Sequence, residues 1–288
     1  MLELDKKVKK MPTPEVIKVL PNSRFTVALN ENFSQALTLT WQWVLANISE
    51  ALITRNAGEV FELLFSELDY VQLNHNAIED VRSLLGQPVD ENVQREITAK
   101  ISTLKQLMGE YLKYPQTNVP LFSHLFEQSN FVVQQLKSLD VVGVGAFMLA
   151  SGFRLALLLE LAASERTARS QIKFRATEDS NYAFNITPKL FRLSIAQIDK
   201  ACQCRSWEST PELEETITHY ECRYFDGKDI HLFRGSGSDV LFECNKHRLL
   251  MFQTVAHKVN QTAATPVRAA LKKWRELANS IQETSSHN

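Results

Sequence analysis

Two glycines one residue apart could begin a nucleotide-binding loop. Gly143 and Gly145 lie in the run VVGVG, and such glycines let the backbone approach a pyrophosphate at a helix N-terminus. The third glycine of that motif would fall at Met148, and no alternation of strands and helices surrounds the run. The pattern therefore favours close packing of helices on small side chains.

A second pattern contains the residue types of a zinc site. Two imidazoles and two thiolates occur as His219-x-x-Cys222 and Cys244-x-x-His247, and such a set can complete a tetrahedral shell around zinc. If residues 219–244 form a three-stranded meander, the middle strand separates the two cysteines by roughly 10 Å. Zinc holds its sulfur ligands at about 2.3 Å, so we predict no metal and no disulfide between Cys222 and Cys244.

The other two cysteines, Cys202 and Cys204, lie two residues apart on an expected helix. Side chains with that spacing face different ways on a helix, so we expect buried or half-buried thiols. Four cysteines in 288 residues are also too few for a scaffold that depends on disulfides.

The sequence contains no recognisable catalytic motif. It has no GxSxG, HExxH, P-loop or Asp-rich metal motif, and the nearby His75, Glu79 and Asp80 are typical of a solvated helix end. Lys plus Arg number 32 against 33 for Asp plus Glu, so no net field draws the chain onto nucleic acid. We predict no cofactor and no nucleic-acid partner, and an enzyme built from scattered residues stays open.

The elements that position these residues are mostly helices. Apolar residues recur every three or four positions over 31–54, 90–114 and 119–138, which is the spacing of one helical face. Asp90 is a suitable N-cap for the second of these helices, and Thr187-Pro188 is typical of a helix start. The remaining expected helices cover 60–71, 76–85, 187–204, 246–261 and 266–281.

Residues 141–163 differ from the other helices because they are apolar on nearly every side. Arg154 and Glu160 are the only charged residues among them. A helix without a polar face is either the buried centre of a bundle or a membrane span. The guanidinium of Arg154 needs an acid or water, so we expect an acidic partner on a neighbouring helix.

Residues 219–244 change to a β period. Three β-prone runs are separated by Asp226-Gly227-Lys228 and by residues 235–238, which predicts a small antiparallel meander. No repeat and no linker divides the chain. The predicted fold is therefore mainly α, a single domain over 12–282 in which a multi-helix bundle surrounds a central apolar helix, with a β excursion at 219–244.

The first residues carry no apolar stretch before a cleavage site, so we predict no signal peptide. The basic run at residues 6–10 is typical of a solvated tail. We expect the protein to be made in the cytoplasm, with release by lysis as the way out.

Residues 97–163 read, in order, ITAKISTLKQLMGEYLKYPQTN, VPLFSHLFEQSNFVVQQLKSLD and VVGVGAFMLASGFRLALLLELAA. This order resembles three helices in the N-terminal helical domain of bacterial insecticidal δ-endotoxins and of the related Pir-type binary toxins. In that family an amphipathic helix ends in a tight Asp-containing loop before a central apolar helix. Leu139-Asp140 has the place of the loop, and the central-helix places are held by Val144, Ala150, Leu155, Leu158 and Leu159.

The resemblance implies a soluble pore-forming toxin that inserts helices 119–138 and 141–163 into a membrane as a hairpin. Its partner would be membrane lipid or a cell-surface receptor. No β-rich receptor-binding domain follows, and the target cell is not implied. The hairpin residues implied are Leu121, Phe122, Leu125, Phe126, Val132, Val133, Leu136, Asp140, Val144, Phe147, Arg154, Leu155, Leu158 and Leu159. The alternative is a non-catalytic cytosolic helical module that binds a protein partner.

Overall fold

The computed structural model describes residues 15–18, 40–65, 68–86, 88–113, 119–162, 166–210 and 215–283. The chain divides into two compact units. The bundle unit comprises residues 33–194 and 258–288, and the sheet unit comprises residues 1–32 and 195–257. That the two fold together as one domain over 12–282 stays a prediction, and the basic run at residues 6–10 lies outside the described residues.

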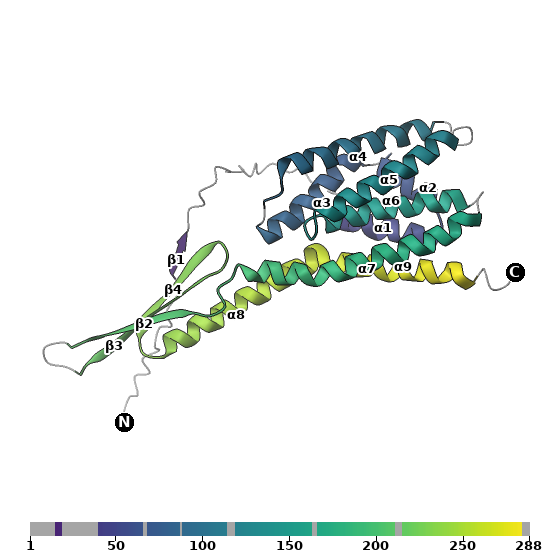
Figure 1. The fold of residues 1–288 in the computed structure, drawn as a ribbon. Helices are drawn as coiled ribbons and strands as arrows, with labels where there is room; N and C mark the ends of the chain where they lie inside the picture. Colours follow the sequence, from purple (N-terminus) through teal and green to yellow (C-terminus); the bar gives the residue numbers. More distant parts are fainter. Residues whose placement is uncertain are drawn as a thin grey trace, which may run out of the picture. The chain divides into compact units, whose positions relative to one another are not determined.

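The bundle unit is built from helices (Figure 1). In the described part of the chain these are α1 (Trp41–Ile53), α2 (Ala57–Phe65), α3 (Tyr70–Leu85), α4 (Glu91–Tyr111), α5 (Val119–Ser138), α6 (Val144–Ala162), α7 (Arg166–Ala196), the π-helical turn η1 (Asn260–Ala264) and α9 (Thr265–Glu283).

Side-chain caps begin three of these helices. Thr40 caps α1, Asp69 caps α3, and Asp90 caps α4 by accepting a hydrogen bond from the Asn92 amide at 2.8 Å. The predicted cap at Asp90 is confirmed. The helix expected over 31–54 is found from Trp41 onwards, and residues 31–39 lie outside the described residues.

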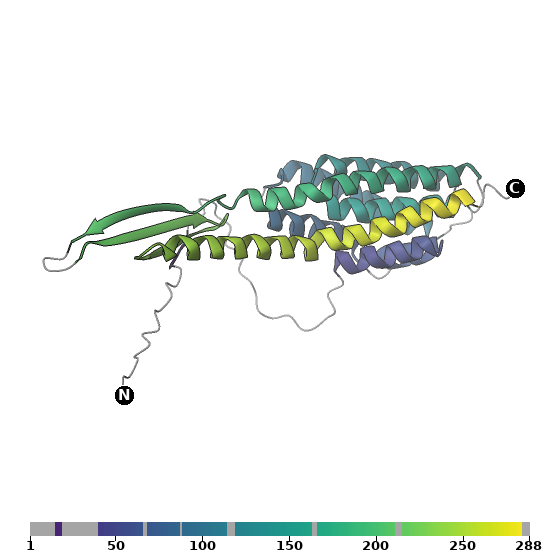
Figure 2. The same cartoon turned by 90° about the horizontal axis from the view of Figure 1, so that it is seen from below.

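The apolar helix α6 is the centre of the bundle, as predicted. It packs on α1, α2, α3 and α5, and Figures 1 and 2 show these helices around it. Glycines allow the close approach, because a Cβ at Gly145 would lie 3.3 Å from the Trp41 ring and one at Gly152 would lie 2.6 Å from Ile48. These glycines therefore allow close helix packing, as the sequence predicts. The helix begins at Val144 and not at residue 141.

The predicted helix start at Thr187-Pro188 is wrong. Both residues lie inside α7, which continues to Ala196. The Thr187 hydroxyl donates to the Ala183 carbonyl at 2.7 Å, so it bonds back into the preceding turn and does not cap a new helix. The helix expected over 187–204 therefore ends earlier, and the strand β2 follows it.

The sheet unit contains β1 (Glu15–Lys18), β2 (Gln203–Ser209), β3 (Ile217–Phe225), β4 (Asp229–Ser236) and most of α8 (Asp239–Val259). The four described strands are antiparallel in the order β1-β4-β3-β2. Gly227, with φ of 99°, and the Asp226 carboxylate, which accepts from the Lys228 and Asp229 amides, form the turn between β3 and β4.

The predicted antiparallel meander is present, but the prediction of its third strand, over residues 239–244, is wrong. Residues 239–244 begin α8, whose first turn contains Asp239, and Val240 and Cys244 on the buried face have helical spacing. The third strand of the meander is instead β2, which lies before β3 in the sequence. A short apolar run such as VLFEC fits both periods, so its type could not be read from periodicity.

All four cysteines form disulfides, so the prediction of free thiols is wrong. Cys202 bonds Cys244 with Cα atoms 6.3 Å apart, and Cys204 bonds Cys222 with Cα atoms 4.0 Å apart. The error follows from the misplaced helix, because in β2 residue Cys204 lies directly opposite Cys222. Cys222 and Cys244 do not bond each other.

Candidate functional site: the α5–α6 hairpin and its polar network

Helices α5 and α6 form a helical hairpin whose two arms are joined by a tight turn. This is the hairpin that the sequence predicts. Asp140 lies in this turn with φ of 49°, a left-handed conformation that Asp tolerates better than most residues. Its carboxylate is exposed and lies 3.1 Å from the Lys189 ammonium of α7. A Cβ at Gly143 would lie 2.4 Å from the Leu136 carbonyl oxygen, so the turn needs glycine there.

Most of the predicted hairpin residues are buried within the bundle unit. Leu121, Phe126 and Leu159 are half-buried, and Asp140 is exposed. The buried members are Phe122, Leu125, Val132, Val133, Leu136, Val144, Phe147, Arg154, Leu155 and Leu158. The described α6 is the only helix in the described residues that is long and apolar enough to cross a membrane, and most of it is buried.

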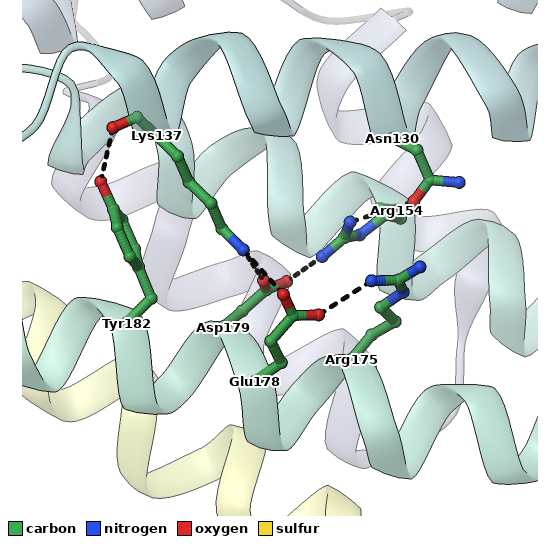
Figure 3. Close-up of polar contacts among 7 residues, drawn as sticks. All are labelled: Asn130, Lys137, Arg154, Arg175, Glu178, Asp179 and Tyr182. Carbon is green, nitrogen blue, oxygen red and sulfur yellow. Dashed lines mark hydrogen bonds and ion pairs between the residues drawn. The ribbon is translucent and has the colours of Figure 1, made fainter.

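The guanidinium of Arg154 lies in the bundle core, where it contacts one carboxylate and one side-chain amide (Figure 3). It donates to the Asp179 carboxylate on α7, and both side chains are completely buried. It also donates to the Asn130 amide oxygen on α5 at 3.0 Å. The predicted acidic partner on a neighbouring helix is confirmed.

Lys137 of α5 brings a second cation to the same carboxylate. Its ammonium nitrogen lies 3.4 Å from Asp179 and 3.1 Å from Glu178. The same nitrogen lies over the rings of Phe147 and Tyr182, at 5.6 and 5.3 Å from their centroids, where the ring faces attract a cation. The lysine is thus held by two carboxylates and two aromatic rings.

Glu178 closes the network at its outer side. Burial raises the pKa of this carboxyl, but hydrogen bonds from Arg175 and Lys137 outweigh burial and hold the pKa below its ordinary value. Arg175 donates to Glu178 at 2.8 Å. Burial, together with the charge of Asp140, raises the pKa of Tyr182, so its hydroxyl stays a donor to the Lys137 carbonyl at 2.9 Å.

The network joins the hairpin to α7. Its cations Lys137 and Arg154 belong to α5 and α6, while the carboxylates Glu178 and Asp179 belong to α7. Among the described residues, every charge of the network has a partner of opposite sign. Removing one partner from such a buried pair leaves an uncompensated charge, at a cost of about 3–5 kcal/mol.

Six members of the network escaped the sequence prediction: Asn130, Lys137, Arg175, Glu178, Asp179 and Tyr182. The buried positions of α7 around Asp179 are mainly small residues, such as Ala176, Ser180 and Ala183. Their spacing is helical, but Ala and Ser are not apolar enough to mark the buried face of the helix against its polar face. The signal that could have found Asp179 is the need of Arg154 for an acid.

The candidate zinc ligands His219, Cys222, Cys244 and His247 do not form a metal site. Cys222 and Cys244 are bonded to different cysteines, His219 lies 2.7 Å from the Ser209 hydroxyl, and Nδ1 of His247 lies 2.5 Å from the Tyr224 hydroxyl. Among the described residues, no group of three or more potential ligands could hold a metal ion.

Comparison with family models, with curated proteins and with solved structures finds no match.

Proposed function

We propose that this chain is a membrane-inserting protein of the pore-forming kind, in which the α5–α6 hairpin leaves the bundle and crosses the bilayer. The observation that carries the proposal is α6, a helix of 19 residues that is apolar on nearly every side and contains two charged residues, Arg154 and Glu160. At a rise of 1.5 Å per residue it reaches about 30 Å, the thickness of the hydrocarbon core. The resemblance to the δ-endotoxin and Pir-type toxins belongs to the same proposal.

Arg154 supports the hairpin as the unit that moves. A guanidinium at mid-membrane costs a few kcal/mol unless it has a polar partner. Asn130 is such a partner on α5, so this contact can travel with the hairpin, whereas Asp179 stays on α7. In solution the ion pairs to α7 hold the hairpin in the bundle, and insertion must break them.

The two-sidedness of α5 supports a role as the lumen-facing helix. Its buried side carries Leu125, Val132 and Leu136, and exposed Glu127 and Gln134 lie away from them. In a hairpin within a bilayer, the polar side of α5 would line water while α6 meets lipid.

The disulfides support activity outside a reducing cytosol. Structural disulfides form and persist in oxidising environments, and both disulfides here cross-link the sheet unit. A protein that reaches target membranes from outside the cell meets this condition. A cytosolic module does not.

The test is to lock α6 to its neighbour and measure dye release from liposomes. A Cβ at Gly145 would lie 3.2 Å from Cβ of Ala77 on α3, so a shift of a few tenths of an ångström reaches the roughly 3.5–4.5 Å between the Cβ atoms of a disulfide. The Ala77→Cys/Gly145→Cys variant should release no dye when oxidised and recover release when reduced. Wild type treated with the same reductant controls for the native disulfides, and the single Gly145→Cys variant controls for crowding against Trp41.

Equal release from the oxidised double variant and from wild type would overturn insertion of this hairpin. The second candidate is the non-catalytic helical module that binds a protein partner. It is favoured by the enclosure of α6, because a core helix of a bundle is also long, apolar and buried. Absence of release by wild type across lipid compositions and pH would replace the first candidate with the second.

A further inference from the structure

Two histidines lie side by side where α8 packs on the sheet. His231 belongs to β4 and His247 to α8, and the centroids of their imidazole rings are 5.0 Å apart. His231 is buried and His247 is half-buried. Tyr224 of β3 stacks on His231 with ring centroids 4.8 Å apart, and Phe233 of β4 lies edge-on to His247. The contact between α8 and the sheet therefore passes through two groups that can titrate near neutral pH.

A single carboxylate serves the two imidazoles, and His231 already occupies it. Oδ2 of Asp226 lies 2.6 Å from Nε2 of His231. Oδ1 of Asp226 accepts hydrogen bonds from the Lys228 and Asp229 amides, both at 2.8 Å. The carboxylate can therefore compensate a positive charge on His231, but both of its oxygens are engaged and none is left for a second cation.

His247 has a hydroxyl group as its partner in place of an acid. Its Nδ1 lies 2.5 Å from the Tyr224 hydroxyl oxygen. Burial, together with the charge of Asp226, raises the pKa of Tyr224, so the phenol keeps its proton and can donate it to a neutral imidazole. A protonated imidazole carries hydrogen on both nitrogens, and this phenol would then have to turn from donor to acceptor. The contact therefore favours the neutral form of His247.

The other charged groups near His247 do not supply a free acid. Arg248, the next residue on α8, is a further cation. Glu243, one turn earlier on the same helix, lies 3.8 Å from the Lys246 ammonium. In the segment before β2, the Asp199 carboxylate accepts a hydrogen bond from a backbone amide of β3 at 2.9 Å. A proton on His247 would thus add a second positive charge beside His231 without a counter-ion of its own.

The direction of the pH effect follows from the pKa of His247. Burial and, after it, the charge of His231 lower this pKa, and the charge of Asp226 opposes them. A histidine whose pKa is lowered by folding contributes its full stability above its ordinary pKa of about 6.5. That stability is lost as pH falls from this value through the lower folded pKa, because the unfolded state then binds the proton more readily.

We propose that His231 and His247 act as a pH-sensitive switch, which keeps α8 packed on the sheet at neutral pH and loosens this packing in mild acid. When both imidazoles are charged, two cations share the one carboxylate of Asp226. Carboxyl groups with ordinary pKa values near 4 stay ionised in this range, so the switch is distinct from general acid unfolding. The inference concerns the sheet unit and does not depend on insertion of the α5–α6 hairpin.

The experiment is hydrogen exchange of the full-length protein at pH 7.5 and pH 5.5, followed by mass spectrometry of peptides from α8. After correction for the intrinsic rates, opening of α8 in wild type should increase at pH 5.5, by up to about tenfold for one such histidine. His247→Gln keeps an acceptor for the Tyr224 hydroxyl but cannot be protonated, and should abolish the increase. His257→Gln is the matched control, because it removes an exposed imidazole of the same helix, and should respond to acid as wild type does.

His247→Phe fills the same space without titrating and takes the place of the glutamine variant if that variant does not fold at pH 7.5. Far-UV circular dichroism at pH 7.5 checks the fold of each variant. An increase in α8 opening that is as large without His247 as in wild type would overturn the switch. So would the absence of any increase in wild type, or an increase that is lost equally in His257→Gln.

Discussion

The bundle unit and the sheet unit stabilise their cores by different means. The bundle surrounds α6 with several helices, and residues from Val144 to Leu158 are all buried. The core cluster of the sheet unit has six buried members, two of which are the disulfide-bonded Cys222 and Cys244. Small units bury too little apolar surface to be stable without help. The cross-links are therefore found where the core is small.

The two units also differ in how they treat charge. The bundle buries Arg154 and Asp179 completely and pairs each with the other, and Asn130 and Lys137 supply further polar contacts to the pair. In the sheet unit, Arg205 and Arg234 pair with Glu221 while their own side chains stay largely exposed. Stability of the bundle should therefore depend on single buried charges, and that of the sheet unit on covalent bonds.

The largest effect is expected from removing the buried cation. Arg154→Met leaves Asp179 in the core with Lys137 as its remaining cation, and should lower the free energy of unfolding by about 3–5 kcal/mol. Urea denaturation followed by far-UV circular dichroism measures it. Arg154→Met/Asp179→Leu should regain most of the loss, because no charge is then left unpaired. A single-variant loss below about 1 kcal/mol would mean that the charge pair is hydrated in solution.

A loss of similar size is expected from emptying the apolar part of the same helix. Leu155→Ala or Leu158→Ala removes a side chain with no exposure, and should cost about 2–5 kcal/mol. The measurement is the midpoint of denaturant unfolding at constant slope. Leu112→Ala, at a residue 39% exposed, is the control and should cost far less. Equal effects at the buried and exposed leucines would contradict α6 as the core of the bundle.

Loss of a disulfide should lower the stability of the sheet unit and leave the stability of the bundle unit unchanged. Cys202→Ser/Cys244→Ser opens a cross-link that spans 42 residues, and should cost about 2–4 kcal/mol. Calorimetry should show a lower melting temperature for the transition of the sheet unit, with the transition of the bundle unit unchanged. Circular dichroism during the same heating assigns each transition to the loss of strands or of helices. A fall of both transitions by the same amount would show that the units unfold together and would remove the contrast between them.

Helix boundaries in the bundle could be predicted because local chemistry decides them. Asp90 caps α4, and α5 runs over the expected residues 119–138, since apolar spacing and turn residues agree there. The central place of α6 could also be predicted, because a helix without a polar face must be covered on all sides.

Partners distant in sequence could not be predicted. The pairing of Cys204 with Cys222 depends on the register of two strands, and four cysteines allow three pairings that sequence alone does not distinguish. Asp179 is paired with Arg154 across 25 residues, and Thr187-Pro188 lies inside α7 where local rules indicate a boundary. The two pairings depend on residues that no local pattern names, and α7 continues through a dipeptide that is typical of a helix start.

The smallest effect concerns the outer edge of the polar network and its dependence on pH. The folded pKa of Glu178 lies below its ordinary value, so the stability from its ion pairs is fully present above that ordinary value and is lost as pH falls through the folded pKa. The side chain is 35% exposed, so screening limits the contribution to about 0.5 kcal/mol. Melting of wild type and Glu178→Gln should therefore differ slightly near neutral pH and converge once the pH has fallen below the folded pKa of Glu178. A difference that grows toward acid would mean that the folded pKa is raised, and that burial outweighs the hydrogen bonds from Arg175 and Lys137.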